Sequence, residues 1–228
     1  MQHKTKNVQG WTMPAYETHY PQEFIIHNTD NYQIRQRNEA LNFCDQRRHA
    51  IDIGANIGLW GRDFCKNFEH VTMFEPDEIN RFCLAENLKN YENKTIYAYG
   101  LYSSEMATTL FGGDHTCGNK SISKEAIMEL SDDKSNWITE TACELRVLDN
   151  FEFENVDFMK LDTQGSELDI LKGSLKTIEK WSPTICVEIT TKNEQQKKEA
   201  KVMYDFFDSI GYKHVGGYKK DKVFKKKV

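Results

Sequence analysis

Basic and acidic side chains lie near the ends of two predicted strands, over residues 156–161 and 184–189. Lys160 and Asp162 are two residues apart, so they point to the same side if the strand continues through them. Glu188 lies near the end of the other strand. Groups of this kind can take a proton from a hydroxyl or lower its pKa. We therefore expect Asp162, Lys160 and Glu188 to be catalytic; for Lys160 and Glu188 a structural ion pair is the alternative.

A glycine-containing loop follows a strand predicted over residues 49–53. Its sequence is Asp52-Ile53-Gly54-Ala55-Asn56-Ile57-Gly58. Gly54 lets the backbone turn sharply, and Gly58 permits close packing or close approach of a ligand. The free amides of the helix predicted over 57–68 can bind a carboxylate or a phosphate. Taken alone, the loop could also be an ordinary tight turn.

An acidic residue stands at the distance where an adenosine-containing ligand needs one. Glu75 comes twenty-one residues after Gly54, at the end of the next predicted strand. In an open α/β sheet, ligands bind at the carboxyl ends of the strands, and an acid there accepts hydrogen bonds from ribose hydroxyls. The loop and Glu75 together predict a cofactor that contains adenosine.

Two such cofactors are a dinucleotide and S-adenosylmethionine (SAM). A pyrophosphate favours a loop with three glycines, G-x-G-x-x-G, whereas Asn56 occupies the middle position here. The loop suits a smaller zwitterion, with Asp52 and backbone groups facing the methionyl ammonium and carboxylate. SAM is therefore the predicted cofactor.

Predicted strands and helices alternate along most of the chain. Further strands are expected over 71–74 and 94–99, and helices over 78–90 with Asp77 as N-cap, 166–179 and 194–209. Repeated strand–helix units favour a mostly parallel sheet covered by helices on both faces. Two closing strands near 211–212 and 223–224, joined by a turn at Gly216-Gly217, should be antiparallel.

Two regions interrupt this pattern. Residues 1–45 form an N-terminal extension expected to pack on the core, with a strand at 24–26 and a helix around 31–44. Residues 101–150 form an insertion on the substrate side, with a helix near 124–130 and a strand at 143–147. An aromatic wall for a sugar or near the sulfonium could be built by Trp11, Tyr16, Tyr20 and Trp137; core packing or a subunit contact is the alternative.

The ordered motifs from about 49 to 189 resemble the FkbM-type SAM-dependent methyltransferases. They are Asp52–Gly58, Phe74-Glu75-Pro76, the segment 157–168, Leu171-Lys172-Gly173 and the segment 183–188; Thr163-Gln164 replaces the usual Val-Glu. The resemblance implies a class I methyltransferase fold, a three-layer sandwich with a seven-stranded sheet, and O-methylation of a sugar, glycan or small metabolite. The expected cofactor contacts are Asp52, Gly54, Asn56, Gly58, Glu75, Pro76, Gly100, Leu101 and Asp162. His115 and Gln164 are candidate substrate contacts.

Composition narrows the function classes. The 228 residues carry a net charge of −5, and no apolar run is long enough for a membrane span. The start has no signal-like apolar segment, and six scattered cysteines are typical of free thiols, so we expect a cytoplasmic protein without a metal site. Residues 219–228 carry six lysines and one aspartate, a local +5, which leaves −10 elsewhere. This run predicts a solvated edge strand or tail, and nucleic acid is a less favoured partner. An RNA ribose 2′-O-methyltransferase and a non-catalytic module of the same fold stay open as alternatives.

Overall fold

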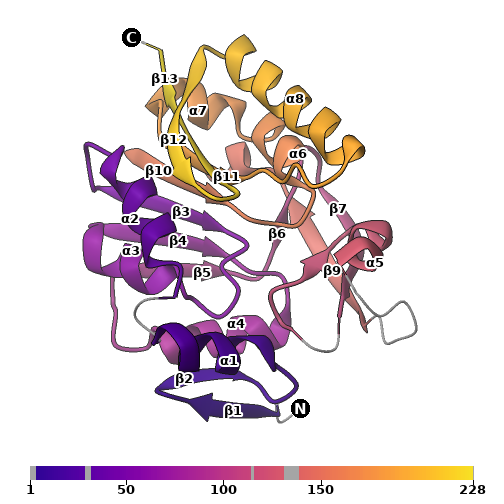
Figure 1. Cartoon of the computed structure of the whole chain (residues 1–228). Helices are drawn as coiled ribbons and strands as arrows, with labels where there is room; N and C mark the ends of the chain where they lie inside the picture. The colour runs from indigo at the N-terminus through magenta and orange to yellow at the C-terminus, as the bar shows by residue number, and fades with distance from the viewer. Residues whose placement is uncertain (1–3, 29–31, 114–115, 131–138, 228) are drawn as a thin grey trace.

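The computed structural model describes residues 4–28, 32–113, 116–130 and 139–227, and its centre is a seven-stranded sheet (Figure 1). In spatial order its strands are β12 (Tyr212–Tyr218), β13 (Asp221–Lys226), β11 (Thr184–Glu188), β10 (Val156–Leu161), β3 (His49–Ile53), β4 (His70–Phe74) and β5 (Lys94–Tyr97). The five strands from β11 to β5 are parallel, and β13 and β12 are antiparallel to their neighbours. The predicted class I methyltransferase fold is confirmed. After β3 the chain adds β4 and β5 on one side of that strand, and it then returns to add β10 and β11 on the other side. The strand order therefore reverses between β3 and β10.

Helices bury both faces of this sheet, because successive side chains of its central strands are buried on both sides. They are α2 (Ile34–Asn42), α3 (Gly61–Asn67), α4 (Glu78–Asn87), α6 (Glu167–Lys172), α7 (Leu175–Trp181) and α8 (Glu194–Ser209). Met159 and Leu161 of β10 pack into one apolar cluster with residues of α6, α7 and α8. Phe158 packs into a second cluster with residues of α2, α3 and α4. Helix α8 has the bounds predicted for it, residues 194–209.

Two helices differ from their predicted extents for identifiable reasons. The helix predicted from residue 57 begins only at Gly61, because Gly58 has φ +91°, which a right-handed helix excludes. The helix predicted over 166–179 is two helices, α6 and α7, which are separated at Gly173-Ser174. Asp149 caps the second of them, since its carboxylate accepts the N–H groups of Lys176 and Thr177 (both 2.9 Å).

The closing hairpin is antiparallel as predicted, but its turn was wrongly placed. The chain turns at Lys219-Lys220, and Gly216 and Gly217 lie inside β12. A Cβ atom at Gly216 would lie 2.6 Å from the Phe43 ring, so this glycine serves packing against the end of α2. The lysine-rich segment includes β13, which lies between two strands and is not the predicted edge strand.

The insertion forms a second sheet beside the first (Figure 1). It contains β6 (Gly100–Leu101), β9 (Thr139–Arg146), β7 (Met106–Gly112) and β8 (Lys120–Ser121), and it is followed by the short helix η2 (Leu148–Phe151). Helix α5 (Lys124–Leu130) has its predicted bounds, and the strand predicted at 143–147 belongs to the longer β9.

The N-terminal extension folds differently from its prediction. A hairpin of β1 (Thr5–Val8) and β2 (Trp11–Pro14), which was not predicted, precedes α1 (His19–His27). The strand predicted at 24–26 is wrong, because those residues lie within α1. Asn87 of α4 holds the hairpin to the core, since its side-chain amide donates to the carbonyls of Thr12 and Ile57 (both 2.8 Å). No helix in the described ranges is long and apolar enough to cross a bilayer.

Candidate active site

The glycine-containing loop follows β3 and contacts the ends of β4 and β10. Gly54, Asn56 and Gly58 all have positive φ, at +80°, +52° and +91°. A Cβ atom at Gly54 would lie 2.1 Å from the carbonyl oxygen of Asp162, at the end of the neighbouring β10. The fold itself therefore requires a glycine here, independently of any ligand.

The loop amides are less available than the sequence suggested. The N–H groups of Gly54 and Ala55 donate to the Phe74 carbonyl, and that of Gly58 donates to Ala55. The Asn56 N–H donates to the Glu75 carboxylate (2.7 Å). The amides of residues 54, 55 and 56 and, within the predicted helix start, that of Gly58 are therefore already engaged inside the protein.

Glu75 is a buried carboxylate at the end of β4, with 5% of its surface exposed. One oxygen accepts the Asn56 N–H, and the other accepts the Asp77 N–H at 2.9 Å. Burial, with the nearby charge of Asp77, raises the Glu75 pKa to about 7. Each oxygen keeps a lone pair, so the carboxylate can accept two further hydrogen bonds.

A cavity of about 590 Å³ opens beside Glu75. Its walls include Pro76, Gly100, Leu101 and Asp162, all of which the sequence placed at a cofactor site. Lys120 of the insertion also lines it and pairs with Asp77 (2.7 Å). Seven of the nine predicted cofactor contacts thus share one cavity. Asp52 and Gly58 do not line it; a Cβ atom at Gly58 would lie 2.8 Å from Leu84, so this glycine serves packing.

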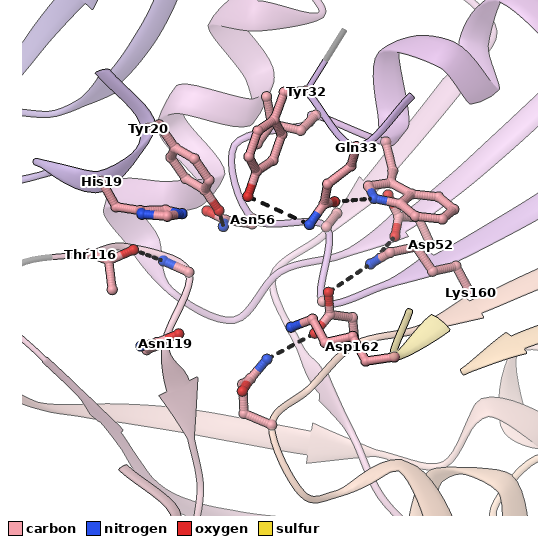
Figure 2. Close-up of a pocket in the computed structure, with 17 residues that line it drawn as sticks. His19, Tyr20, Tyr32, Gln33, Asp52, Asn56, Thr116, Asn119, Lys160 and Asp162 are labelled. Atoms are coloured by element: carbon pink, nitrogen blue, oxygen red, sulfur yellow. Dashed lines mark hydrogen bonds and ion pairs between the residues drawn. The ribbon is translucent and has the colours of Figure 1, made fainter. Parts of the chain in front are cut away.

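Lys160 lies between two carboxylates at the point where β3 and β10 are neighbours. It is directly opposite Asp52 in the parallel register, and its ammonium is 3.5 Å from Asp52 and 3.6 Å from Asp162 (Figure 2). Burial lowers the Lys160 pKa, but the two carboxylates outweigh it and hold that pKa above its ordinary value. Burial raises the Asp162 pKa, yet the ammonium groups of Lys160 and Lys220 outweigh it and hold it below its usual range. Both groups are therefore charged near neutral pH.

Asp52 has hydrogen-bonding capacity to spare. Its side chain is fully buried, and neither carboxylate oxygen has a hydrogen-bond partner within the described structure. Burial raises its pKa. A buried carboxylate that faces a cavity with unused lone pairs can bind a cationic or hydrogen-bond-donating group of a ligand.

Glu188 lies behind Asp162 and borders neither cavity. It pairs with Lys220 of the β12–β13 turn (2.6 Å), and its carboxyl group hydrogen-bonds to Asp162. Burial, with the charge of Asp162, raises the Glu188 pKa to about 8. Asp221, opposite Glu188 in the register, has a pKa raised by burial to about 6. Lys160 and Glu188 do not pair with each other.

A second cavity, of about 700 Å³, is also lined by the loop (Figure 2). Asp52, Lys160 and Asp162 form one side, and Tyr20, Tyr32 and Gln33 of the N-terminal extension form the side opposite Asp162. The residues common to both cavities are Gly54, Asn56, Gly118 and Asp162. The two cavities thus adjoin along the loop and Asp162.

The loop after β10 is held by its own side chains. Gln164 lines the cavity near Tyr20, and its side-chain amide donates to Asp162 (2.9 Å). Glu167 accepts hydrogen bonds from the Thr163 and Gly165 N–H groups, at 2.8 and 3.0 Å, so it shapes the loop. His115 and Trp137 lie outside the described residues. No three described metal-binding side chains are grouped closely enough to hold an ion.

Several cavity residues were not singled out as site residues from the sequence. Tyr32, Gln33, Trp60 and Lys220 all line the cavity shared with Asp52. Of the proposed aromatic wall, Tyr20 lines it, whereas Trp11 is buried beneath Arg62. Trp60 could have been noticed, because a large aromatic two residues after the loop must lie close to it. The others carry no sequence signal.

Comparisons with known proteins agree with this fold. Residues 52–214 match the model of the methyltransferase FkbM domain. A solved FkbM methyltransferase from Methylobacillus flagellatus is 19% identical with a TM-score of 0.51, covering 78% of this chain and 43% of that one. M. jannaschii TYW2, solved with AdoMet, is 11% identical (TM-score 0.50, covering 99% and 88%). An rRNA methylase from Streptococcus thermophilus is also 11% identical (TM-score 0.50, covering 85% and 95%). No curated protein sequence matches.

The chain spans less than half the length of the M. flagellatus protein, so that protein's full activity does not transfer directly. The family match, however, covers most of this chain and begins at Asp52, in the loop that separates the two cavities. It continues through Glu75 and Asp162 into the closing hairpin. The chain therefore belongs to the FkbM methyltransferase family.

Proposed function

We propose that the protein binds SAM across the two adjoining cavities and transfers its methyl group to a hydroxyl of a sugar, glycan or small metabolite. One observation carries this proposal: Asp162, an ionised carboxylate, lies where the two cavities meet. SAM that extends from Glu75 in one cavity to Asp52 in the other would pass Asp162, and an acceptor in the rest of the second cavity would place the reacting atoms beside it.

The residues present fit the cofactor. Glu75 can accept both ribose hydroxyls with its unused lone pairs, while Pro76, Gly100 and Leu101 provide walls for the adenosine part. Asp52, whose oxygens lack hydrogen-bond partners, can accept the methionyl ammonium. Bound there, SAM supplies a methyl group on a positively charged sulfur.

Asp162 and the side chains around it would position the acceptor and take up its proton. In-line transfer requires the acceptor oxygen about 3 Å from the methyl carbon, opposite the sulfur. With SAM bound, Asp162 would be placed to accept the proton that the acceptor hydroxyl loses on methylation. Lys160 stays protonated between two carboxylates, so it acts as a positioning residue that keeps Asp162 ionised. Glu188 acts from behind Asp162, through the hydrogen bond between their carboxyl groups.

The alternative, methylation of RNA, finds less support. Lys220, Lys225 and Lys227 pair with Glu188, Asp45 and Asp208, so much of the positive charge of the closing segment is neutralised. A phosphate backbone needs clustered unpaired cations. The described site favours a small acceptor.

Two measurements test the proposal. Isothermal titration should show SAM binding, and labelled SAM should transfer methyl to an acceptor in a panel of sugars, nucleosides and RNA. Asp162→Asn should abolish transfer, while Asp205→Asn, an exposed substitution on α8, should leave it unchanged. Failure to bind SAM would favour a non-catalytic role, and a salt-sensitive transfer to RNA alone would favour the alternative.

A further inference from the structure

The side of the acceptor cavity opposite Asp162 is built from segments far apart in sequence (Figure 2). Tyr20 and Gln33 come from the N-terminal extension, and Asn119 comes from the insertion. Asn56 joins the two segments to the loop, because its amide donates to the Tyr20 hydroxyl (2.7 Å) and its oxygen accepts from the Cys117 thiol (3.3 Å).

Gln33 is held in place before any ligand arrives. Its backbone is in the left-handed region at φ +52°, and its side-chain oxygen accepts the Trp60 indole N–H (2.8 Å). The buried Arg37 guanidinium pairs with Asp63 and donates to the Tyr32 carbonyl, which fixes the preceding residue. A wall fixed in this way can select ligands without paying for its own ordering.

This wall keeps unused hydrogen-bonding capacity. The Tyr20 and Tyr32 hydroxyls accept hydrogen bonds from Asn56 and Gln33, which leaves their own hydrogens available to donate. Among the described residues the Asn119 side chain has no hydrogen-bond partner, so within that part of the chain its amide and its carbonyl stay available to a ligand. Neutral donors and acceptors of this kind match hydroxyl groups.

The charges around the cavity disfavour an anion. Lys160 and Lys220 are the described lysines that line it, and carboxylates already offset their charges: Lys160 lies beside Asp52 and Asp162, and Lys220 also acts on the charge of Asp162. An acceptor that carries a phosphate or carboxylate would meet Asp162 without a free ammonium to offset the repulsion.

We propose that Gln33 and Asn119 are acceptor-specificity residues, an inference that rests on the proposed function. Together they select an uncharged ligand with several hydroxyl groups. They bind the acceptor by neutral hydrogen bonds across the cavity from Asp162. The N-terminal extension is thereby part of the binding site.

Acceptor kinetics at saturating SAM test this proposal on the full chain. The probes are uncharged methyl hexopyranosides and matched hexose phosphates and uronic acids. Turnover should be confined to the uncharged set. Gln33→Ala and Asn119→Ala should each raise the acceptor KM about tenfold, the effect of about one hydrogen bond, with little change in kcat and none in the Kd for SAM. Gln195→Ala, an exposed substitution on α8, is the matched control and should change neither constant.

A charge-adding variant sharpens the test. Gln33→Lys should admit the anionic probes, whereas Gln33→Glu should not. Asn119→Ala keeps the proposal testable if Gln33 variants fold poorly, because Asn119 bonds to no described residue. Anionic probes turned over as well as neutral ones, or an unchanged KM in Asn119→Ala, would refute this inference while leaving the methyltransferase proposal standing. Absence of SAM binding would refute both.

Discussion

Replacing Glu75 separates its structural role from its role in binding the cofactor. Its two oxygens accept the N–H groups of Asn56 and Asp77 in a buried setting. Glu75→Ala leaves both amides without partners, at about 1–3 kcal/mol each. At roughly 2–4 °C per kcal/mol for a chain of this size, the melting temperature should fall by about 4–24 °C. Glu75→Gln keeps one acceptor but turns its NH₂ group toward an N–H, so its stability should be intermediate.

The same substitution should weaken SAM binding well below the melt. Charge-assisted hydrogen bonds to the ribose are worth about 1.5–3 kcal/mol each before desolvation costs. At about 1.4 kcal/mol per decade, the SAM Kd should rise tenfold or more in Glu75→Ala. Isothermal titration at a temperature where every variant is folded measures this directly.

A matched control comes from the start of the same helix. Asp77 caps α4 through the Asn80 N–H (2.9 Å) and borders neither cavity. Asp77→Ala should therefore cost about 1 kcal/mol of stability and, measured above pH 8 where Glu75 is ionised in both proteins, leave the SAM Kd unchanged. Normal affinity in folded Glu75→Ala would refute the ribose assignment and leave Glu75 as a support for the loop and helix alone.

The binding constant should also depend on pH. The Glu75 pKa is raised to about 7, and only the ionised carboxylate offers acceptors to both hydroxyls. Ionisation goes from about one tenth at pH 6 to about nine tenths at pH 8, so the SAM Kd should fall about tenfold over this range. A flat profile that matches Glu75→Gln would show that the ribose does not meet this carboxylate.

Three further outcomes follow from the buried groups. Lys160→Met strands Asp52 as an unpaired buried charge, so urea unfolding should show a loss of about 3–5 kcal/mol; a loss below 1 kcal/mol would contradict the ion pair. Gly54→Ala should cost about 1–3 kcal/mol more than Gly10→Ala, because both glycines have positive φ but only at Gly54 does a Cβ meet backbone, and equal melts would refute this. Glu188 has a folded pKa of about 8 against 4.5 unfolded, so its protonated form stabilises the fold below about pH 4.5 and that stability is lost as the pH rises to 8. Urea midpoints from pH 5 to 8 should therefore fall less in Glu188→Gln than in the original chain.

Local patterns in the sequence were enough for most of the central fold. Alternating and helical spacings report which face of a segment is buried, so β3, β10 and α8 have their predicted bounds. Because parallel strands end at one edge of a sheet, the sequence also indicated that Asp52, Glu75 and Asp162 lie near one another. These residues do line two adjoining cavities.

Tertiary structure alone decided what each strand end meets. From the sequence, Lys160 could pair with Asp162 or with Glu188. In the structure it lies beside Asp162 and Asp52, because the neighbouring strand β3 has Asp52 directly opposite Lys160. Residues 24–26, predicted as a strand, are helical, and Gly216, predicted in the turn, packs against Phe43. Neighbours distant in sequence determine both outcomes. Gln33 and Lys220 reach the cavity from opposite ends of the chain. Such contacts depend on which segments the fold brings together, and periodicity within a segment carries no information about its partners.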